Sequence, residues 1–395
     1  MISVEKASKI IGSHTRSYGQ ENVPLSQALG RILASDVKAD RPFPPYDRVC
    51  MDGIAIDHSS YQNGQRTYRI QDVQSAGSAR MALESSNLAF EVMTGAILPK
   101  GTSTVIRYED LKWISDDEVE IMIDAKDKAN IHYCGEDLER SASLVKRGSV
   151  LRSPEIALCA TVGASYVPVL KLPRVALISS GDELVDIDEH PEDHQIRKSN
   201  IHMLAAELGK LGLEYDSFHL HDVKKEITEQ LTGILKEFDI VMMSGGVSKG
   251  KFDFIPGVLN DLGVRKHFHK VEQRPGKPFW FGTSDKCIVF AFPGNPVSTL
   301  VCYMKYFRPW LKRCLGTDQA LRNVRLAEDF EFRPSLTYFA QVRVEETETG
   351  GVAHMLKGHG SGDMVNLSRV DGFLELPEGS NVYHSGEYFA FLPFD

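Results

Sequence analysis

SGGVSKGKFD (residues 244–253), QRPGKPFWFG (273–282) and AFPGNPVS (291–298) are the segments that decide the fold of this chain. Short apolar runs, typical of buried strands, precede the first and the last of these loops. Glycine lets backbone N–H groups approach a ligand, and a helix that starts after such a loop adds partial positive charge at its N-terminus. The three loops therefore predict an anion site at the carboxyl edge of an α/β sheet.

Alternating strand and helix patterns surround these loops. Because β and α elements alternate, we expect an α/β fold with a doubly wound, mostly parallel sheet, whose ligands bind outside the carboxyl ends of the strands. The expected strands cover residues 174–181, 215–220, 240–243 and 286–292, and the expected helices cover residues 199–212, 224–238, 253–263 and 296–316.

The rest of the chain changes character twice. Residues 1–14 have an amphipathic helical pattern, and we expect helix to continue to about Ala39. Prolines 42, 44 and 45 then indicate an extended linker. These patterns predict an elongated helical domain (1–45 plus 146–172), an inserted β-rich domain (46–145), an α/β domain (173–317) and a small C-terminal β domain (318–395).

Composition narrows the class of protein. The chain has 395 residues, 42% of them hydrophobic, and a formal net charge of −9. This charge argues against nucleic acid or an anionic membrane as partner, and no apolar run approaches the length that spans a membrane. Six cysteines without CxxC spacing favour free thiols in a cytoplasmic protein and disfavour zinc.

Acidic residues follow several of the expected strands. Glu183, Asp222 and Asp253 all fall at the same edge of the expected sheet, near Lys277. Converging carboxylates repel one another unless a cation is present, which favours a metal site. Taken singly, however, Asp182 in the GDEL motif suits a turn, and aspartates ahead of helices suit N-caps.

The glycine loop at residues 245–250 has the composition of a loop that surrounds a ligand. Gly245, Gly246 and Gly250 permit tight turns, and Ser248 is a donor to an oxyanion. The motif lacks the order of a dinucleotide fold and the lysine–serine pair of a Walker loop. A plain strand-to-helix connection explains the glycines equally well.

Two further loops supply cations and a helix start. Arg274 and Lys277 lie on a proline-stiffened loop, which suits an anion clamp. Asn295 suits a turn or a helix cap, and the helix that follows offers its N-terminus to an oxyanion. In the other domains, Asp52, Thr94 and Asp137 fit ordinary turns, and residues 358–368 form a Gly/Ser loop that suits either a phosphate contact or a flexible connection.

The ordered motifs MDG, TGA, GED, SGDEL, GGVSKGKFD, PGKP, PGNPVS and SGDMVNL resemble the MoeA family of molybdopterin molybdenumtransferases over essentially the whole chain. This resemblance implies a homodimer of four-domain subunits. It also implies a Mg²⁺-dependent enzyme that ligates molybdate onto adenylylated molybdopterin and releases AMP.

The resemblance also implies roles for particular residues. Those at the reacting centre would be Asp52, Thr94, Glu183, Asp222, Asp253 and Lys277. Those that bind the cofactor would be Asp137, Gly245, Gly246, Ser248, Arg274, Pro293, Pro296, Ser298 and Ser361. Glu183 and Asp253 would hold Mg²⁺, and Asp52, Thr94 and Asp137 would face the α/β domain of the partner subunit.

The sequence departs from the family at three places. Arg48-Val49-Cys50 precedes MDG where the family has small or polar residues, Arg274 replaces a frequent lysine, and Gln341 falls where the family has an arginine, with Arg343 two residues later. Three alternatives stay open, namely a molybdopterin adenylyltransferase, a non-catalytic carrier or scaffold, and a preference for tungstate. A molybdopterin adenylyltransferase is also a possible partner.

Overall fold

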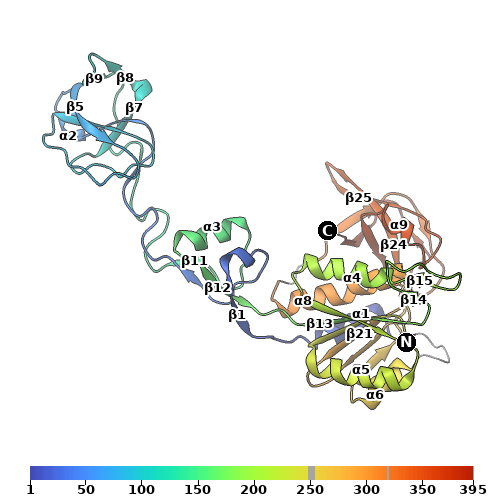
Figure 1. Cartoon of the computed structure of the whole chain (residues 1–395). Helices are drawn as coiled ribbons and strands as arrows, with labels where there is room; N and C mark the ends of the chain where they lie inside the picture. The colour runs from blue at the N-terminus through green and yellow to red at the C-terminus, as the bar shows by residue number, and fades with distance from the viewer. Residues whose placement is uncertain (248–253, 318–319, 395) are drawn as a thin grey trace. The chain divides into compact units, whose positions relative to one another are not determined.

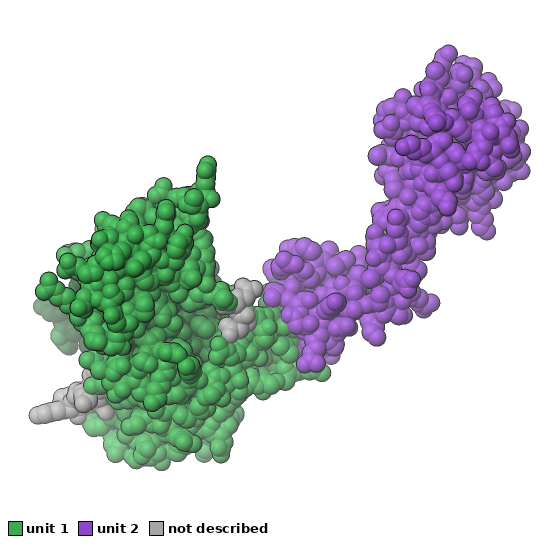
Figure 2. Space-filling view, turned by 180° about the vertical axis from the view of Figure 1, so that it is seen from behind, with its two compact units in different colours: residues 1–21, 30–32, 170–395 green, residues 22–29, 33–169 purple. Residues whose placement is uncertain are grey.

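The computed structural model describes residues 1–247, 254–317 and 320–394. The chain forms two compact units, which Figure 2 colours green and purple. Unit 1 comprises residues 1–21, 30–32 and 170–395, and unit 2 comprises residues 22–29 and 33–169. Each unit has apolar cores of its own. The four-domain division stays a prediction.

The main sheet of unit 1 has the strand order β16-β13-β17-β21-β20-β18. Its strands are β13 (Val175–Ser180), β16 (Tyr215–Leu220), β17 (Ile240–Ser244), β18 (Arg265–His269), β20 (Trp280–Thr283) and β21 (Ile288–Phe292). The pairs β13–β16, β13–β17 and β17–β21 are parallel, whereas β20 pairs antiparallel with both β21 and β18. The expected mostly parallel sheet is confirmed, and its antiparallel edge is additional.

Helices cover both faces of this sheet, as a doubly wound fold requires. Figure 1 shows α4 and α8 on one side and α5 and α6 on the other. The helical segments are α1 (Val4–Gly12), α4 (Ser199–Lys210), α5 (Lys224–Glu237), α6 (Ile255–Asp261), α7 (Pro296–Cys302), the π-helical η3 (Tyr303–Phe307) and α8 (Arg308–Cys314). Since β13, β17 and β21 are buried along their whole length, their continuous apolar runs are typical of strands covered on two faces.

The N-terminal helix belongs to the same core. The hydroxyl of Ser3 caps α1 by accepting a hydrogen bond from the Lys6 N–H at 3.2 Å. Its buried residues Val4, Ala7 and Ile11 pack in the core that contains residues of α4, η3 and α8. The amphipathic pattern of residues 1–14 therefore predicted a real helix, and its apolar face is buried by the α/β sheet domain.

A second sheet closes unit 1, in the order β19-β24-β25-β22-β28-β26. Its strands are β19 (Gln273–Arg274), β22 (Asn323–Leu326), β24 (Thr337–Thr347), β25 (Gly350–Met355), β26 (Gly372–Leu376) and β28 (Tyr388–Pro393). Shorter elements are β14 (Leu184–Val185), β15 (Ile196–Arg197), β23 (Phe330–Glu331), β27 (Val382–Tyr383) and α9 (Met364–Leu367). The β-rich C-terminal region is confirmed, and β19 joins the Arg274 loop to it through parallel pairing with β24.

Unit 2 contains the sheet β7-β4-β6-β5-β9-β8. Its elements are η1 (Leu25–Gln27), β2 (Val37–Lys38), β3 (Arg48–Val49), β4 (Gly53–Ile56), α2 (His58–Gln62), β5 (Thr67–Gln74), β6 (Leu88–Val92), β7 (Thr104–Arg107), η2 (Tyr108–Asp110), β8 (Leu111–Trp113), β9 (Glu118–Ile121), β10 (Ile131–His132), β11 (Ser143–Val145) and α3 (Ser153–Thr161). The expected β-rich insertion and the helix after it are confirmed.

The helix expected up to about Ala39 was wrong beyond α1. Residues Gln20–Pro24 form strand β1, paired with β12 (Tyr166–Leu170), and only the 3₁₀ turn η1 follows. Pro24 lacks a backbone N–H, and Gly30 adopts a left-handed φ of 76°, so neither continues a helix. Backbone hydrogen bonds to the β12 region replace the helical ones, as from the Ala34 N–H to the Pro168 oxygen at 2.9 Å.

Replacement of Phe290 by alanine should strongly destabilise unit 1. This fully buried ring contacts the rings of Phe281, Phe307 and Trp310. The lost burial and the cavity left behind should lower the free energy of unfolding by about 3–5 kcal/mol, measured by urea unfolding. The control Tyr388→Ala, at a side chain that is 59% exposed, should change it little, and equal effects of the two variants would contradict this core.

Candidate active site

A cleft of about 700 Å³ opens at the carboxyl ends of β13, β17 and β21. This is the edge at which parallel α/β sheets bind ligands. The residues that line the cleft are Ser179, Ser180, Gly181, Glu183, Leu184, Ile196, Arg197, Lys198, Ser199, Asn200, Ile201, Asp222, Ser244, Gly245, Gly246, Val247, Pro278, Pro293, Gly294, Asn295, Pro296, Gly362 and Met364. Six of the residues predicted from sequence, Glu183, Asp222, Gly245, Gly246, Pro293 and Pro296, therefore meet at one cavity.

The glycine loop after β17 lies against the end of β13. Gly245 and Gly246 have left-handed φ values of 98° and 67°. A Cβ atom on Gly245 would lie 2.7 Å from the backbone oxygen of Ser180, which is shorter than any normal contact. Glycine is thus required at Gly245 by both its backbone conformation and the close approach of two chain segments.

Asp182 joins two of the loops that border the cleft. Its Oδ1 accepts hydrogen bonds from the Asp222 N–H at 3.2 Å and lies 3.1 Å from His221 Nδ1. The hydrogen bond from the Asp222 N–H lowers the pKa of Asp182 below its usual value, and the His221 side chain adds a smaller effect in the same direction. The turn role expected for Asp182 therefore fits its contacts, and these contacts position the neighbouring Glu183 and the opposite Asp222.

The capping alternative was wrong for Asp222, whereas Asn295 does occupy a helix N-cap position. The N-cap of α5 is Val223, and no side chain caps this helix. Asn295 occupies the N-cap position of α7 but its side chain makes no capping bond. Instead, its Nδ2 donates to Ser361 Oγ at 2.8 Å, while the Val297 N–H donates to the Ser361 oxygen at 3.1 Å. The Gly/Ser loop is thus fastened to the start of α7.

Gln341 supports this Gly/Ser loop from the C-terminal sheet. Its Oε1 accepts a hydrogen bond from Asn366 Nδ2 at 3.0 Å. Asp363 in turn caps α9 by accepting from the Asn366 N–H at 3.1 Å. The position at which the sequence departs from its family therefore contacts the loop that carries Ser361, whereas Arg343 is exposed two residues farther along β24.

Other predicted residues lie beside the cleft or outside the described residues. Arg274 and Lys277 are exposed and do not line it, although the adjoining Pro278 does. Neither cation forms an ion pair with another described residue. Ser298 is buried within α7. Ser248, Gly250 and Asp253 lie outside the described residues, so their predicted roles stay predictions.

Three residues of the cleft were missed by sequence reasoning. Ser180 ends β13, and Lys198 and Asn200 lie at the start of α4. Lys198 is only 12% exposed and pairs with Asp186 at 2.8 Å. The sequence signal was available, because RKSN (residues 197–200) spans the end of the short strand β15 and the start of α4.

The predicted residues of unit 2 form contacts within that unit. Asp52 Oδ1 accepts a hydrogen bond from the Thr94 N–H at 2.6 Å, so the MDG and MTGA motifs meet. Asp137 Oδ1 lies 2.9 Å from His132 Nε2, and the other ring nitrogen of His132 lies 3.0 Å from Arg48 Nη2. Arg48, another position that departs from the family, is therefore connected to Asp137 through one imidazole.

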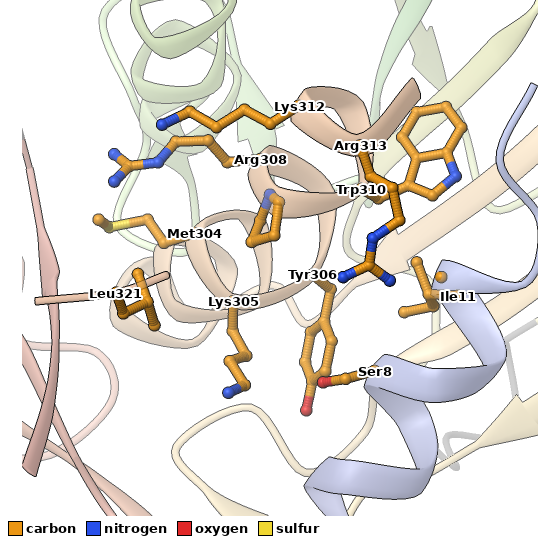
Figure 3. Close-up of a pocket in the computed structure, with 12 residues that line it drawn as sticks. Ser8, Ile11, Met304, Lys305, Tyr306, Arg308, Trp310, Lys312, Arg313 and Leu321 are labelled. Atoms are coloured by element: carbon orange, nitrogen blue, oxygen red, sulfur yellow. The ribbon is translucent and has the colours of Figure 1, made fainter. Parts of the chain in front are cut away.

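A second cavity in unit 1, of about 220 Å³, lies among α1, η3 and α8 (Figure 3). Its lysine and arginine side chains give it a basic rim, while Ile11, Met304 and Trp310 make its walls apolar. Lys305 is bound to Glu375 at 2.6 Å, and Arg308 donates to the Pro393 oxygen at 3.0 Å. These cations join helices to the C-terminal sheet, so the cavity is a packing feature of that junction.

Family models match successive parts of the chain. They are the MoeA N-terminal region, domains I and II, over residues 2–163, a probable molybdopterin binding domain over 176–313, and the MoeA C-terminal region, domain IV, over 323–394. A molybdopterin molybdenumtransferase of Synechocystis sp. is 36% identical over 99% of both chains. The chain belongs to the MoeA family.

Other MoeA-family comparisons agree. A molybdopterin molybdenumtransferase of Staphylococcus aureus is 30% identical over 98% of this chain and 94% of its own length. Two crystal structures of molybdopterin biosynthesis MoeA proteins from Pyrococcus horikoshii match with a TM-score of 0.84, at 28% and 26% identity. They cover 100% of this chain and 99% and 100% of theirs. Most residues that line the cleft belong to the matched molybdopterin binding domain, and Gly362 and Met364 belong to the matched MoeA C-terminal region.

Within residues 1–247, 254–317 and 320–394, no group of three or more His, Cys, Asp or Glu side chains is arranged to hold a metal ion. In the same part of the chain, none of the helices combines the length and the hydropathy that a membrane crossing needs.

Gly245→Ala should destabilise unit 1 by about 1–3 kcal/mol, because a side chain at this position is strained in φ and collides with backbone. Gly294→Ala is the matched control in the same cleft. A Cβ there would approach no atom nearer than 3.7 Å, and Gly294 has no left-handed φ. Urea unfolding measures both variants, and equal midpoints for the two would contradict the close approach of Gly245 to Ser180.

Asp52 should make the stability of unit 2 depend on pH in the acid range. The Thr94 N–H lowers the pKa of Asp52, so the carboxylate stabilises the folded state above the unfolded pKa of about 4. This contribution is lost as the pH falls through the lower, folded pKa. The difference in urea midpoint between the wild type and Asp52→Asn should therefore shrink on acidification, and a constant difference would exclude the interaction.

Proposed function

We propose that this MoeA-family chain inserts molybdate into adenylylated molybdopterin at the β13–β17–β21 cleft and releases AMP. The observation that carries the proposal is the meeting of Glu183, Asp222 and the Gly245–Gly246 loop at one cavity of the molybdopterin binding domain. The relatives reported above are named molybdopterin molybdenumtransferase, which supports transfer of molybdenum to molybdopterin.

The chemistry of the cleft suits an anionic substrate in a protein with a net charge of −9. The tight Gly245–Gly246 loop brings its backbone close to the cavity, and Lys198 adds a cation at its wall. Arg274 and Lys277, exposed beside Pro278, are placed to attract a molybdate dianion to the entrance. Preorganised donors and cations of this kind stabilise charge without reorganisation during the reaction.

The carboxylates of the cleft fit Mg²⁺ as a resident metal. Hard carboxylate oxygens from Glu183 and Asp222 line the cavity, and Mg²⁺ usually takes one or two protein carboxylates together with substrate phosphates. We propose that Glu183, with Asp253, holds the ion, which when bound neutralises charge on the adenylyl phosphate. Asp182 positions Glu183 through its bonds to the β16–α5 loop.

The residues of unit 2 are proposed to complete the site of a partner subunit. Asp52 is bonded to the Thr94 N–H, and Asp137 lies beside His132, so each pair forms a polar cluster of unit 2. A homodimer would let them act on bound substrate. We further propose a cytoplasmic location, which the free thiols at the described cysteines support, and delivery of substrate by a molybdopterin adenylyltransferase.

The alternative activities are less favoured. A molybdopterin adenylyltransferase, or a carrier without catalysis, explains the molybdopterin binding domain alone, whereas the MoeA N-terminal and C-terminal regions also match. ATP consumption would identify the adenylyltransferase, and tight binding without AMP release would identify a carrier. Parallel assays with molybdate and tungstate decide between the two oxyanions.

Glu183→Gln should slow molybdate-dependent AMP release from adenylylated molybdopterin about 10²-fold or more at fixed Mg²⁺, because charge stabilisation in the reacting complex is lost. Asp253→Asn should act in the same direction. The control Glu237→Gln removes an exposed carboxylate at the far end of α5 and should leave the rate unchanged. Wild-type protein that releases no AMP would reject the proposed function. Unchanged rates for both Glu183→Gln and Asp253→Asn would reject the roles proposed for these two residues.

A further inference from the structure

Two buried polar atoms at the cleft have no hydrogen-bond partner among the described residues. They are the hydroxyl oxygen of Ser180 and the side-chain carbonyl oxygen Oδ1 of Asn200. Both residues line the cavity, and Ser180 is only 4% exposed. Six other buried polar side-chain atoms of the described residues also lack a partner, but only Ser180 and Asn200 line this cleft, where a ligand can supply the missing hydrogen bonds.

The orientation of the Asn200 amide is fixed by its other end. Nδ2 donates to the backbone oxygen of Gly294 at 2.5 Å and to Ser244 Oγ at 2.9 Å. A backbone oxygen can only accept a hydrogen bond, so the nitrogen of the amide must face Gly294. The carbonyl oxygen of Asn200 is therefore held as an acceptor that awaits a donor.

The neighbouring serine shows that an orphan hydroxyl is not a general property of this strand end. Ser179 is also 4% exposed, but its Oγ lies 2.9 Å from His219 Nδ1 and donates to the Phe218 oxygen at 3.3 Å. Ser180 Oγ instead lies near Gly246, where an added Cβ would be 3.1 Å away. The two serines thus form a matched pair, one bonded to protein and one turned toward the glycine loop.

The two unpaired atoms restrict which ligand groups can form hydrogen bonds with them. A carbonyl oxygen cannot donate a hydrogen bond, so Asn200 Oδ1 is a poor neighbour for a phosphate or molybdate oxygen. A pterin ring instead presents an amino group and a ring N–H side by side on one edge, which is a pair of donors. Adenine offers an amino group beside an acceptor nitrogen, and the Ser180 hydroxyl can donate to such a nitrogen, so AMP is the competing ligand that the test must separate from the pterin.

We propose that Asn200 Oδ1 and Ser180 Oγ bind the N–H edge of the pterin ring of the substrate. This inference rests on the proposed function, because it assumes that molybdopterin occupies the cleft. It assigns the inner wall beside β13 and α4 to the pterin, and leaves the carboxylates Glu183 and Asp222 to the adenylyl end. Ser180 and Asn200 are then specificity-determining residues.

The test compares Ser180→Ala with Ser179→Ala by calorimetric titration of the full chain with 6-hydroxymethylpterin and, separately, with AMP. Loss of one hydrogen bond should weaken pterin binding by Ser180→Ala about three- to tenfold and leave AMP binding unchanged. Its thermal midpoint should not fall, because the removed hydroxyl had no partner in the protein. Ser180→Cys has a side chain of similar volume but forms only weak hydrogen bonds, so it should also weaken pterin binding.

Ser179 also lines the cavity, but its hydroxyl is bonded to His219 and Phe218, so Ser179→Ala should lower the thermal midpoint and weaken pterin binding less than Ser180→Ala does. Unchanged pterin binding in both Ser180 variants, or a loss confined to AMP, would overturn the assignment. AMP release by the wild type is measured separately. A wild type that binds the pterin but releases no AMP would reject only the transferase activity, whereas normal AMP release together with unaffected pterin binding by Ser180→Ala would reject only this inference.

Discussion

Parallel pairing of β13 with β16 and β17, and of β17 with β21, is the constraint on which the rest of unit 1 depends. In-register parallel strands end at a common edge, so the loops after them must meet there. The apolar strands are buried on both faces, and their backbone polar groups are therefore satisfied within the sheet. The loops at the edge are the part of this core that is free to carry polar chemistry.

Some polar residues at that edge are bonded to other parts of the protein, and others line the cavity, where a ligand can reach them. Asp182 is fully engaged in tying the β13 loop to the β16–α5 loop, and Asn295 in tying α7 to Ser361. Glu183 and Asp222 line the cavity beside these ties, and Ser180 and Asn200 retain unpaired atoms. Rigid neighbours thus hold a small set of polar groups at the cavity, which is the arrangement that the proposed catalysis by preorganised charge requires.

The three sequence departures from the family have different structural settings. Gln341 binds Asn366 and so supports the Gly/Ser loop, and Arg48 contacts the imidazole that also contacts Asp137. Arg274 lies in β19, which pairs with β24 of the C-terminal sheet. Each altered residue is therefore connected to a segment with a predicted site residue, although none of the three lines the cleft itself.

The sequence by itself determined the strand and helix order of the α/β domain, because continuous apolar runs and helical periodicity report burial directly. It also predicted that Glu183, Asp222 and the glycine loop share one edge, since parallel topology fixes where loops emerge. Only the tertiary structure decided that residues 20–24 pair with β12, that Asp222 is not a cap, and that Ser180 lacks the partner that Ser179 has. Those outcomes depend on contacts between segments distant in sequence, which no local pattern encodes.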